Sequence, residues 1–302
     1  MPYILLILTT LFWSGNFVLS RGMHAAIPPL TLSFWRWAVA LLILSCFGLR
    51  HFLAQRELAL RHKKFIIVQG IVGVAGFNTF IYLAMQTTTA INAVLVNSCI
   101  PVLIVLISWL MFKDRLSLRQ CLGVATSLSG VLLIISRGEL SSLLLLHFNR
   151  GDVLVFIAAM LWAFYSANLK RYPQGLHPFA YQVGIVMVGL TVLLPCYLLD
   201  IASGRTMVIS AGTIITILYV AIFASVLAFI FWNRAIAELG ANIAGPFIHL
   251  MPAFSTVLAV VFLGETLTGT HIKAILLIFS GIFMTTFRLG KKERIKRSYH
   301  ST

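Results

Sequence analysis

The stretch AINAVLVNSCIPVLIVLISWLMFKDRLSLRQCLGVATSLSGVLLIISR, from Ala90 to Arg137, decides the fold because the chain contains it twice. The second copy starts 151 residues later and runs from Ala241 to Arg288. Each copy has a long apolar segment with an internal proline, a short turn with one carboxylate, and a second long apolar segment. Duplicated units of this kind are typical of membrane proteins that move a solute through a site between the two copies. The repeat therefore indicates a transporter.

The composition places the chain in a lipid bilayer. Apolar residues make up 60% of the 302 residues and charged residues only 10%, whereas charged residues reach roughly 25% in soluble chains. The net charge of +15 does not indicate nucleic-acid binding, because the basic residues sit between apolar runs, as in cytoplasmic loops. The four cysteines lie inside apolar runs without metal-ligand spacing, so neither a disulfide framework nor a metal site is expected.

Ten apolar segments are long enough to cross a bilayer, which takes about 20 helical residues. Helices are expected because lipid offers no partner to unpaired backbone groups, and the segments are too long for barrel strands. The sequence therefore predicts an all-α integral membrane protein. The approximate spans are 3–20, 30–49, 65–85, 90–112, 118–136, 152–169, 178–199, 210–233, 241–263 and 271–287.

The distribution of lysine and arginine predicts the orientation. With the N-terminus in the cytoplasm, seventeen of these residues fall in cytoplasmic segments and five in outside connections, so both termini are predicted to be cytoplasmic. The repeat extends to the front of each half, where Trp13 aligns with Trp162. Five spans per half give the two copies opposite orientations, which makes the repeat inverted. We expect one five-helix unit at 1–140, a second at 150–290 and a basic cytoplasmic tail at 291–302.

Several short motifs, in their order along the chain, resemble those of one family. They are FWSGNF (12–17), PPLTLSFWRW (28–37), the mid-span prolines Pro101 and Pro252, and GETLTG (264–269). With them the chain resembles the drug/metabolite transporter superfamily, and within it the EamA-like bacterial exporters. The resemblance implies ten transmembrane helices, arranged as two inverted five-helix repeats around a central cavity. It also implies a carrier in the bacterial cytoplasmic (inner) membrane that moves amino acids or related small metabolites outward. Asp114 departs from the family's usual glutamate, which the second copy keeps at Glu265.

Prolines and tryptophans near the middle of spans are expected to line the cavity. Pro101 and Pro252 each remove a backbone hydrogen bond and predict bent helices, which either face substrate or serve packing alone. Trp13 and Trp162 occupy matching repeat positions near the midplane, where indole needs a partner for its N–H. The pair predicts aromatic cavity walls, with helix packing as the alternative.

Polar side chains inside the apolar spans are expected to face the bundle interior. Some will serve as interhelical contacts, and the others will offer uncharged hydrogen bonds to a zwitterionic or neutral solute. His249 is the one histidine deep in a span. It carries a proton, holds a substrate carboxylate, or is a buried neutral structural side chain. The predicted substrate-binding set is Trp13, Asn16, Asn78, Tyr82, Asn97, Trp162, Tyr165, Asn233 and His249.

Three charged residues have predicted structural roles. Arg36 lies inside span two, about 10 Å from its outer end at 1.5 Å per residue. It either attracts an anionic group or extends outward to brace a helix end, and the sequence favours bracing. Asp114 and Glu265 each follow a repeated helix and precede a Leu-Ser or Leu-Thr step, so we expect them to cap the next helix.

The sequence also excludes several functions. All eight carboxylates lie in loops or at span ends, so no midplane carboxylate is available for cation/proton exchange of the small multidrug-resistance type. The spans hold no lysine and arginine cluster for sugar-phosphate substrates, and no G-x-x-x-x-G-K-[ST] motif for ATP is present. Neither H-E-x-x-H nor G-x-S-x-G appears, so we expect no enzyme, no catalytic residue and no cofactor.

These observations together predict a secondary carrier that exports amino acids or related small metabolites by alternating access. Its partners are a small-molecule substrate and the lipid bilayer. An efflux carrier for lipophilic drugs is an alternative, because the spans are rich in Trp and Phe, and an open channel is another. Ten spans can enclose a cavity alone, so a monomer is favoured over a dimer.

Overall fold

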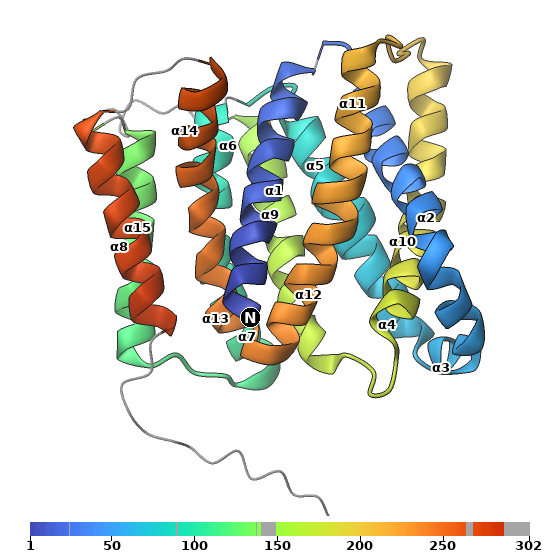
Figure 1. Ribbon diagram of the computed structural model, residues 1–302, viewed down its shortest axis with the longest axis horizontal. Coiled ribbons are helices and arrows are strands. Elements are labelled where there is room, and N and C mark those ends of the chain that lie inside the picture. The colour runs from blue at the N-terminus through green and yellow to red at the C-terminus, as the bar shows by residue number, and fades with distance from the viewer. Residues whose placement is uncertain (24, 89, 137, 140–148, 264–267, 287–302) are drawn as a thin grey trace, which may run out of the picture.

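The computed structural model describes residues 1–302 except 24, 89, 137, 140–148, 264–267 and 287–302, and the described residues form helices without a strand (Figure 1). Ten helical stretches among them have the length and composition to cross a membrane. The all-α fold predicted from the sequence is therefore confirmed. Glu265 and the basic tail at 291–302 lie outside the described residues.

The first half of the chain holds five spans, and a polar cap fixes the start of the fifth. Ser117 Oγ accepts a hydrogen bond from the backbone N–H of Gln120, whose side-chain oxygen accepts one from the Ser117 N–H. The helices of this half are α1 (Pro2–Gly22), span one; α2 (Pro29–Ala54), span two, followed by the short α3 (Arg56–Arg61); α4 (Lys63–Gln69), η1 (Gly70–Gly76) and α5 (Phe77–Ala84), span three; α6 (Ala90–Asn97) and α7 (Ile100–Phe112), span four; and α8 (Leu118–Ile135), span five.

The second half repeats this arrangement. Asn149 caps its first helix by accepting from the Asp152 N–H, and the Asp152 carboxylate accepts from the Asn149 N–H. The helices of this half are α9 (Arg150–Asn168) and η3 (Leu169–Arg171), span six; α10 (Pro178–Ala202), span seven; α11 (Ala211–Tyr219), η4 (Val220–Leu227) and α12 (Ala228–Leu239), span eight; α13 (Ala241–Ala244), η5 (Gly245–His249) and α14 (Leu250–Leu263), span nine; and α15 (Gly269–Thr286), span ten.

Asp114 does not cap α8, contrary to the sequence-based expectation. The N-cap is Ser117, which lies directly before α8 and forms a capping box with Gln120. Asp114 lies three residues further back and pairs instead with Lys170 at the end of span six, with 2.6 Å between Oδ2 and Nζ. The proximity of a basic side chain from another span decided the role of this carboxylate, and the local pattern did not reveal it.

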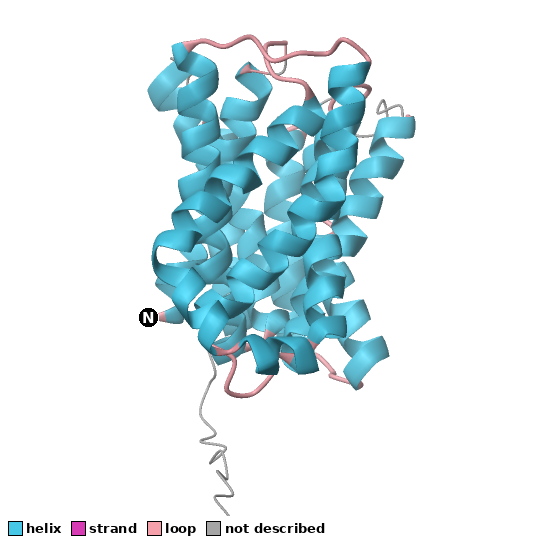
Figure 2. Ribbon diagram, turned by 90° about the vertical axis from the view of Figure 1, so that its right-hand side faces the viewer, coloured by secondary structure: helices cyan, strands magenta, loops and turns pink. Residues whose placement is uncertain are grey.

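The two halves form an inverted repeat. Figure 1 shows α1 rising from the end of the bundle that holds the N-terminus, whereas α9, its counterpart, descends toward that end. The last described helix, α15, also ends on the N-terminal side. The loops gather at the two ends of the bundle, and the helices fill the space between them (Figure 2). Five spans in each half are what reverses the second copy.

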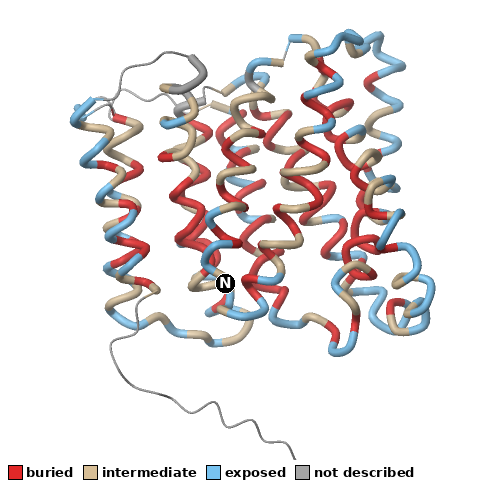
Figure 3. The backbone as a smooth tube through the Cα atoms, viewed as in Figure 1, coloured by how far each residue is buried: buried red, intermediate tan, exposed pale blue. Residues whose placement is uncertain are grey.

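Equivalent helices of the two halves pack against each other at both edges of the molecule. The counterparts α2 and α10 pack at one edge, and the counterparts α8 and α15 pack at the other (Figure 1). The remaining six spans lie between these two pairs. Buried residues concentrate on these inner spans, while the outer faces of the edge helices are exposed (Figure 3). This arrangement leaves the six inner spans to build a site.

The α8–α15 contact is a close backbone approach at glycines. A Cβ atom on Gly281 would lie 2.4 Å from the carbonyl oxygen of Gly123 and 2.4 Å from the backbone nitrogen of Ser127. A Cβ on Gly123 would lie 2.6 Å from the Gly281 oxygen. Only a residue without a side chain fits where two helix backbones meet at such distances, as in many packed membrane helices.

Replacing Gly281 by alanine is therefore expected to lower the free energy of unfolding by about 1–3 kcal/mol or more, because backbone atoms cannot move aside as a flexible side chain can. Thermal unfolding of the detergent-purified protein, followed by tryptophan fluorescence, measures the effect. Gly269 begins the same helix, and a Cβ atom added there would meet no atom within 4 Å, so Gly269→Ala is the matched control. Equal unfolding temperatures for the two variants would contradict the close contact.

Four of the inner spans are discontinuous, whereas the sequence predicted single helices. Span four is split between α6 and α7, and Pro101 lies in the first turn of α7. Span nine contains the 3-10 segment η5 just ahead of Pro252. Spans three and eight each contain a π-helical stretch, η1 and η4, at corresponding places in the two halves. Such irregular backbone concentrates at functional sites and frees carbonyl groups for other partners.

Candidate functional site

A small central cavity of about 20 Å³ lies where the six inner spans meet. Its walls come from spans one, three, four, six, eight and nine, so both halves of the chain contribute to one site. The described residues that line it are aromatic, aliphatic or amide side chains, and none of them is ionisable. Of the residues singled out from the sequence, the cavity brings together Trp13, Asn16, Asn78, Asn97 and Trp162.

Two clefts adjoin this cavity on the side away from the N-terminus. One has a volume of about 200 Å³, is lined by Asn16 and Tyr82, and reaches the loops before α2 and after α5. The other has a volume of about 140 Å³ and is lined by Asn97 and Pro252. Phe17 borders the cavity and both clefts. The site is therefore reached from the end of the bundle opposite the N-terminus.

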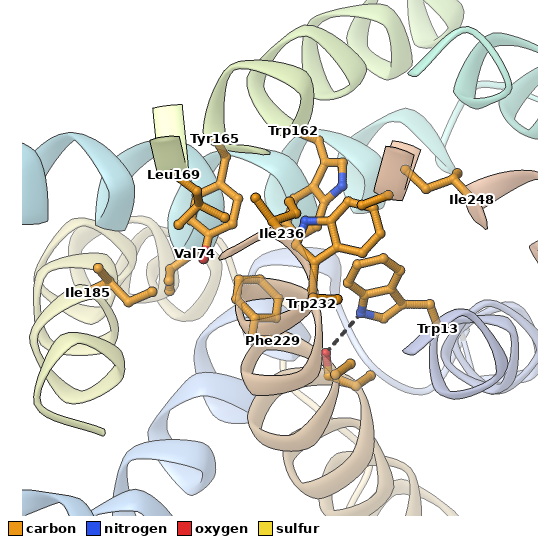
Figure 4. Packing of buried hydrophobic residues seen from close by; sticks show 14 of the residues in the cluster. Trp13, Val74, Trp162, Tyr165, Leu169, Ile185, Phe229, Trp232, Ile236 and Ile248 are labelled. Carbon is orange, nitrogen blue, oxygen red and sulfur yellow. Dashed lines mark hydrogen bonds between the residues drawn. The ribbon is translucent and has the colours of Figure 1, made fainter. Parts of the chain in front are cut away.

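An aromatic layer lies on the other side of the cavity, and Figure 4 shows its members Trp13, Trp162, Phe229 and Trp232 gathered together. The ring of Trp162 lies 5.0 Å from that of Trp13 and 5.3 Å from that of Phe229, between centroids. Trp232 lies 5.3 Å from Trp13 in the same layer. The indole N–H of Trp13 donates to the carbonyl oxygen of Ala224 at 3.2 Å, so its polar end is satisfied while its ring faces the cavity. Trp13 and Trp162 therefore form part of the cavity wall and also pack against neighbouring helices.

A hydrogen-bond network lies beyond the aromatic layer, toward the N-terminal end. Tyr165 donates to Asn233 Oδ1 at 2.8 Å. The Gln69 side-chain amide donates to the backbone oxygen of Tyr165 at 3.2 Å and to the Tyr181 hydroxyl at 3.3 Å. Tyr165 and Asn233 do not line the central cavity or either of its outer clefts. These two predicted site residues therefore lie on its closed side.

The closed-side pair has a counterpart on the open side. Tyr165 stands 149 residues after Asn16, and Asn233 stands 151 residues after Tyr82, which are the two spacings of the repeat. In the first half Tyr82 donates to Asn16 Oδ1 at 3.3 Å, and in the second half Tyr165 donates to Asn233 Oδ1. Each half thus links its first and third spans by a tyrosine–asparagine pair, with the two residue types exchanged.

His249 lies away from the cavity. Its ring is fully buried, its Nδ1 is 2.7 Å from Ser127 Oγ, and its Nε2 is 3.0 Å from the backbone oxygen of Ser98. Both ring nitrogens are thus engaged by spans four and five, and the described residues around the cavity and its clefts do not include it. This geometry favours the structural role among the alternatives that the sequence left open.

Arg36 does not extend outward, so the bracing role favoured from the sequence is wrong. Its side chain is 1% exposed and points into the bundle. Nε donates to Ser225 Oγ at 2.9 Å, and Nη1 donates to Asn78 Oδ1 at 2.8 Å and to the Tyr82 hydroxyl at 2.6 Å. Spans three and eight supply these acceptors, which is why the sequence of span two alone gave no sign of them.

The π-helical segment η4 explains part of this network. Within it, the Ser225 hydroxyl donates to the Val220 oxygen at 2.8 Å and accepts from Arg36. The Ala224 carbonyl accepts from Trp13 and, at 3.4 Å, from Arg36 Nη2. A wider helical turn leaves such a carbonyl free to face a neighbouring span. The sequence held no signal for this irregularity, and these partners of Arg36 were missed.

A separate cleft lies at the N-terminal end of the bundle. It has a volume of about 610 Å³ and is lined by Asp114, Lys170, Tyr172 and Asn242. The Asp114–Lys170 ion pair joins the turn after span four to the end of span six, and thus joins the two halves. Burial raises the pKa of Tyr172, so its hydroxyl stays neutral. The aromatic layer and the network around Gln69 lie between this cleft and the central cavity.

Comparisons with known proteins all lead to transporters. A profile described as the EamA-like transporter family matches residues 1–136 and again 149–287. A relative named uncharacterized transporter YyaM, from Bacillus subtilis, is 25% identical over 85% of this chain and 84% of its own. Two relatives carry the name probable amino-acid metabolite efflux pump. The one from Salmonella typhimurium is 26% identical over 94% of both chains, and the one from Escherichia coli is 23% identical over 97% of both.

A solved structure shares the fold. It superposes with a TM-score of 0.75 over 94% of this chain and 96% of its own, at 20% identity. At that identity the likeness supports the fold alone. These relatives cover 85–97% of the chain, and the solved structure covers 94% of it.

Proposed function

The chain belongs to the EamA-like transporter family, and on that basis we propose that it exports amino acids or related small metabolites by alternating access. It is a multi-pass membrane transporter with a small-molecule substrate and the bilayer as partners. One observation carries the proposal: a central cavity that both halves line with amide and aromatic side chains. Such walls suit a solute with a polar, hydrogen-bonding end and an apolar body. The names of the relatives from Salmonella and Escherichia agree with this substrate class.

The two tyrosine–asparagine pairs support the mechanism. The Asn16–Tyr82 pair faces the open cleft, and the Tyr165–Asn233 pair lies in the closed network. In an inverted repeat, exchange of the two conformations between the halves turns an open side into a closed one. We propose that the second pair opens toward the N-terminal side when the first pair closes. The proposed substrate contacts are then Trp13, Asn16, Asn78, Tyr82, Asn97 and Trp162.

The proposed setting is the bacterial inner membrane with both termini in the cytoplasm, because this orientation assigns seventeen basic residues of the sequence to cytoplasmic segments and five to outside connections. The cavity would then face outward in this conformation. The repeat units are proposed at 1–140 and 150–290. A monomer suffices, since one chain encloses the cavity.

Efflux of lipophilic compounds is a second candidate. The aromatic side chains Trp13, Phe77, Trp162 and Phe229 line the same cavity and offer stacking surfaces to apolar solutes. Stacking on these rings alone would bind a substrate that has no polar group. The transport assay below separates the two candidates.

Counterflow in proteoliposomes tests the proposal. Vesicles are loaded with one unlabelled amino acid at a time and assayed for transient accumulation of its labelled form, which a carrier with a single saturable site produces and a channel does not. We expect saturable accumulation of at least one amino acid that has an apolar side chain. Protein-free vesicles are the control. If no amino acid accumulates while lipophilic dyes do, the protein is an efflux carrier for lipophilic compounds and not a metabolite exporter.

A further inference from the structure

Arg36 is a buried cation without a carboxylate partner. Its guanidinium is 1% exposed and donates only to neutral groups, which belong to Asn78, Tyr82, Ser225 and Ala224. The ion pairs among the described residues do not include it. An arginine cannot shed its proton in a protein, and a buried charge without a counter-charge is strongly unfavourable inside a membrane. The network is therefore one negative charge short.

The fold itself does not require a cation at this position. The repeat counterpart of Arg36, 149 residues later, is Ile185, which is fully buried in the equivalent helix of the second half. The same scaffold thus accommodates an aliphatic side chain at the matching place. A charge that the scaffold does not need, placed beside the cavity in one half only, points to a role toward a ligand.

Arg36 also fixes which ends of two amide side chains of the cavity wall are engaged in the hydrogen-bond network. A guanidinium has only donors, so Asn78 must turn its oxygen toward Arg36, which leaves the Asn78 Nδ2 group pointing elsewhere. That buried nitrogen has no hydrogen-bond partner. The Tyr82 hydroxyl accepts from Arg36 and donates to Asn16 Oδ1, which in turn commits the Asn16 oxygen and leaves its amide nitrogen. Both asparagines line the central cavity.

We propose that this wall binds the anionic group of the substrate. The inference rests on the proposed function and names a feature of its substrate, a carboxylate. The carboxylate accepts hydrogen bonds from the amide nitrogens of Asn78 and Asn16. Arg36, which contacts Asn78 from behind the cavity wall, supplies the compensating positive charge. Arg36 acts as a positioning residue, because it orients both amides and does not itself line the cavity. The aromatic rings of Trp13 and Trp162 receive the apolar part of the solute.

Three related probes test the proposal by binding. L-Phenylalanine carries both charged groups, 3-phenylpropionate lacks the ammonium group, and 2-phenylethylamine lacks the carboxylate. Dissociation constants for the detergent-purified full chain are measured by tryptophan fluorescence. We expect both carboxylates to bind at least about tenfold more tightly than the amine, the ratio typical of losing one charge-assisted interaction. Binding of the amine as tight as that of the carboxylates, or no binding by either carboxylate, overturns the proposal.

Asn78→Asp is the decisive variant. It places a carboxylate where Asn78 Oδ1 now lies, 2.8 Å from Arg36 Nη1, so the chain itself supplies the missing negative charge and should fold at least as well. We expect the preference for carboxylates to vanish or to reverse toward 2-phenylethylamine. Asn78→Ser is the matched neutral control and should keep the preference for carboxylates with weaker binding. An unchanged preference in Asn78→Asp would mean that Arg36 is only structural.

Counterflow of L-phenylalanine separates this inference from the proposed function. If the protein prefers carboxylates in binding but shows no counterflow, the transport proposal is wrong and the anion site is retained. If it shows counterflow but no preference for carboxylates, the anion site is wrong and the transport proposal is retained. Thermal unfolding of each variant confirms that comparisons are made on folded protein.

Discussion

Replacing Trp162 by alanine is expected to reduce counterflow about tenfold or more, because one side chain supplies both a wall and the floor of the central cavity. The ring is 1% exposed and lies 5.0 Å from Trp13, 5.0 Å from Phe77 and 5.1 Å from Tyr165, between centroids. Its loss enlarges the cavity and removes part of the layer that separates the cavity from the network around Gln69. The measurement is the initial rate of labelled substrate uptake per reconstituted folded molecule.

Two variants control for the loss of stability, which runs to about 3–5 kcal/mol for a buried tryptophan. Trp162→Phe keeps an aromatic surface and should retain most of the transport. His249→Ala breaks buried contacts to Ser127 and Ser98 but does not touch the cavity. It should lower the unfolding temperature and keep transport per folded molecule. If His249→Ala stops transport in folded protein while Trp162→Ala does not, the central cavity is not the transport site.

A covalent bridge across the N-terminal end of the bundle is expected to stop transport completely and reversibly. Asp114→Cys and Lys170→Cys, in a chain whose four native cysteines are replaced, put thiols on two residues that form an ion pair between the halves. A short bifunctional, reducible thiol reagent joins them. Alternating access requires this end to open, so the bridged carrier can bind substrate from the open cleft but cannot release it on the other side. Counterflow before bridging, after bridging and after reduction is the measurement.

The same reagent on a pair within one helix is the control. Arg234 and Glu238 form an ion pair one turn apart on α12, with 3.1 Å between Nε and Oε1. Cysteines at these positions should react equally well and leave counterflow unchanged, since their bridge joins no moving parts. Full counterflow with the Asp114 and Lys170 positions bridged would contradict alternating access through this end, while a loss in the control pair would show damage by the reagent.

The sequence predicted the spans well because bilayer thickness acts on each segment separately. Ten apolar segments, their inverted duplication and the family all followed from the order of the residues. The sequence also predicted that Trp13, Asn78 and Trp162 lie deep in their spans, and in the structure all three line the central cavity. The length of a span and the depth of a residue in it depend only on the order of residues along one helix.

Rotation about the helix axis and contacts between spans did not follow. His249 and Tyr165 lie at suitable depths, yet their side chains point toward neighbouring spans and not into the cavity. Arg36 was assigned an outward direction because the acceptors Asn78 and Ser225, on spans three and eight, are remote in sequence. The π-helical turns that place some of these acceptors have no compositional signature. Which side chains of different spans face each other is a property of the tertiary structure, and it cannot be inferred from each span's sequence alone.

The pairing of α2 with α10 and of α8 with α15 has a consequence for biosynthesis. Each edge helix of the first half packs against its counterpart in the second half, so α8 meets its partner only when α15 has entered the bilayer. Until then the glycine face of α8 around Gly123 is open to lipid and to other chains. Synthesis must therefore proceed through α15 before this edge of the molecule can close. If synthesis stops after the first half, the five inserted helices include α2 and α8 without their partners α10 and α15. Membrane quality control can then recognise these unpaired helices.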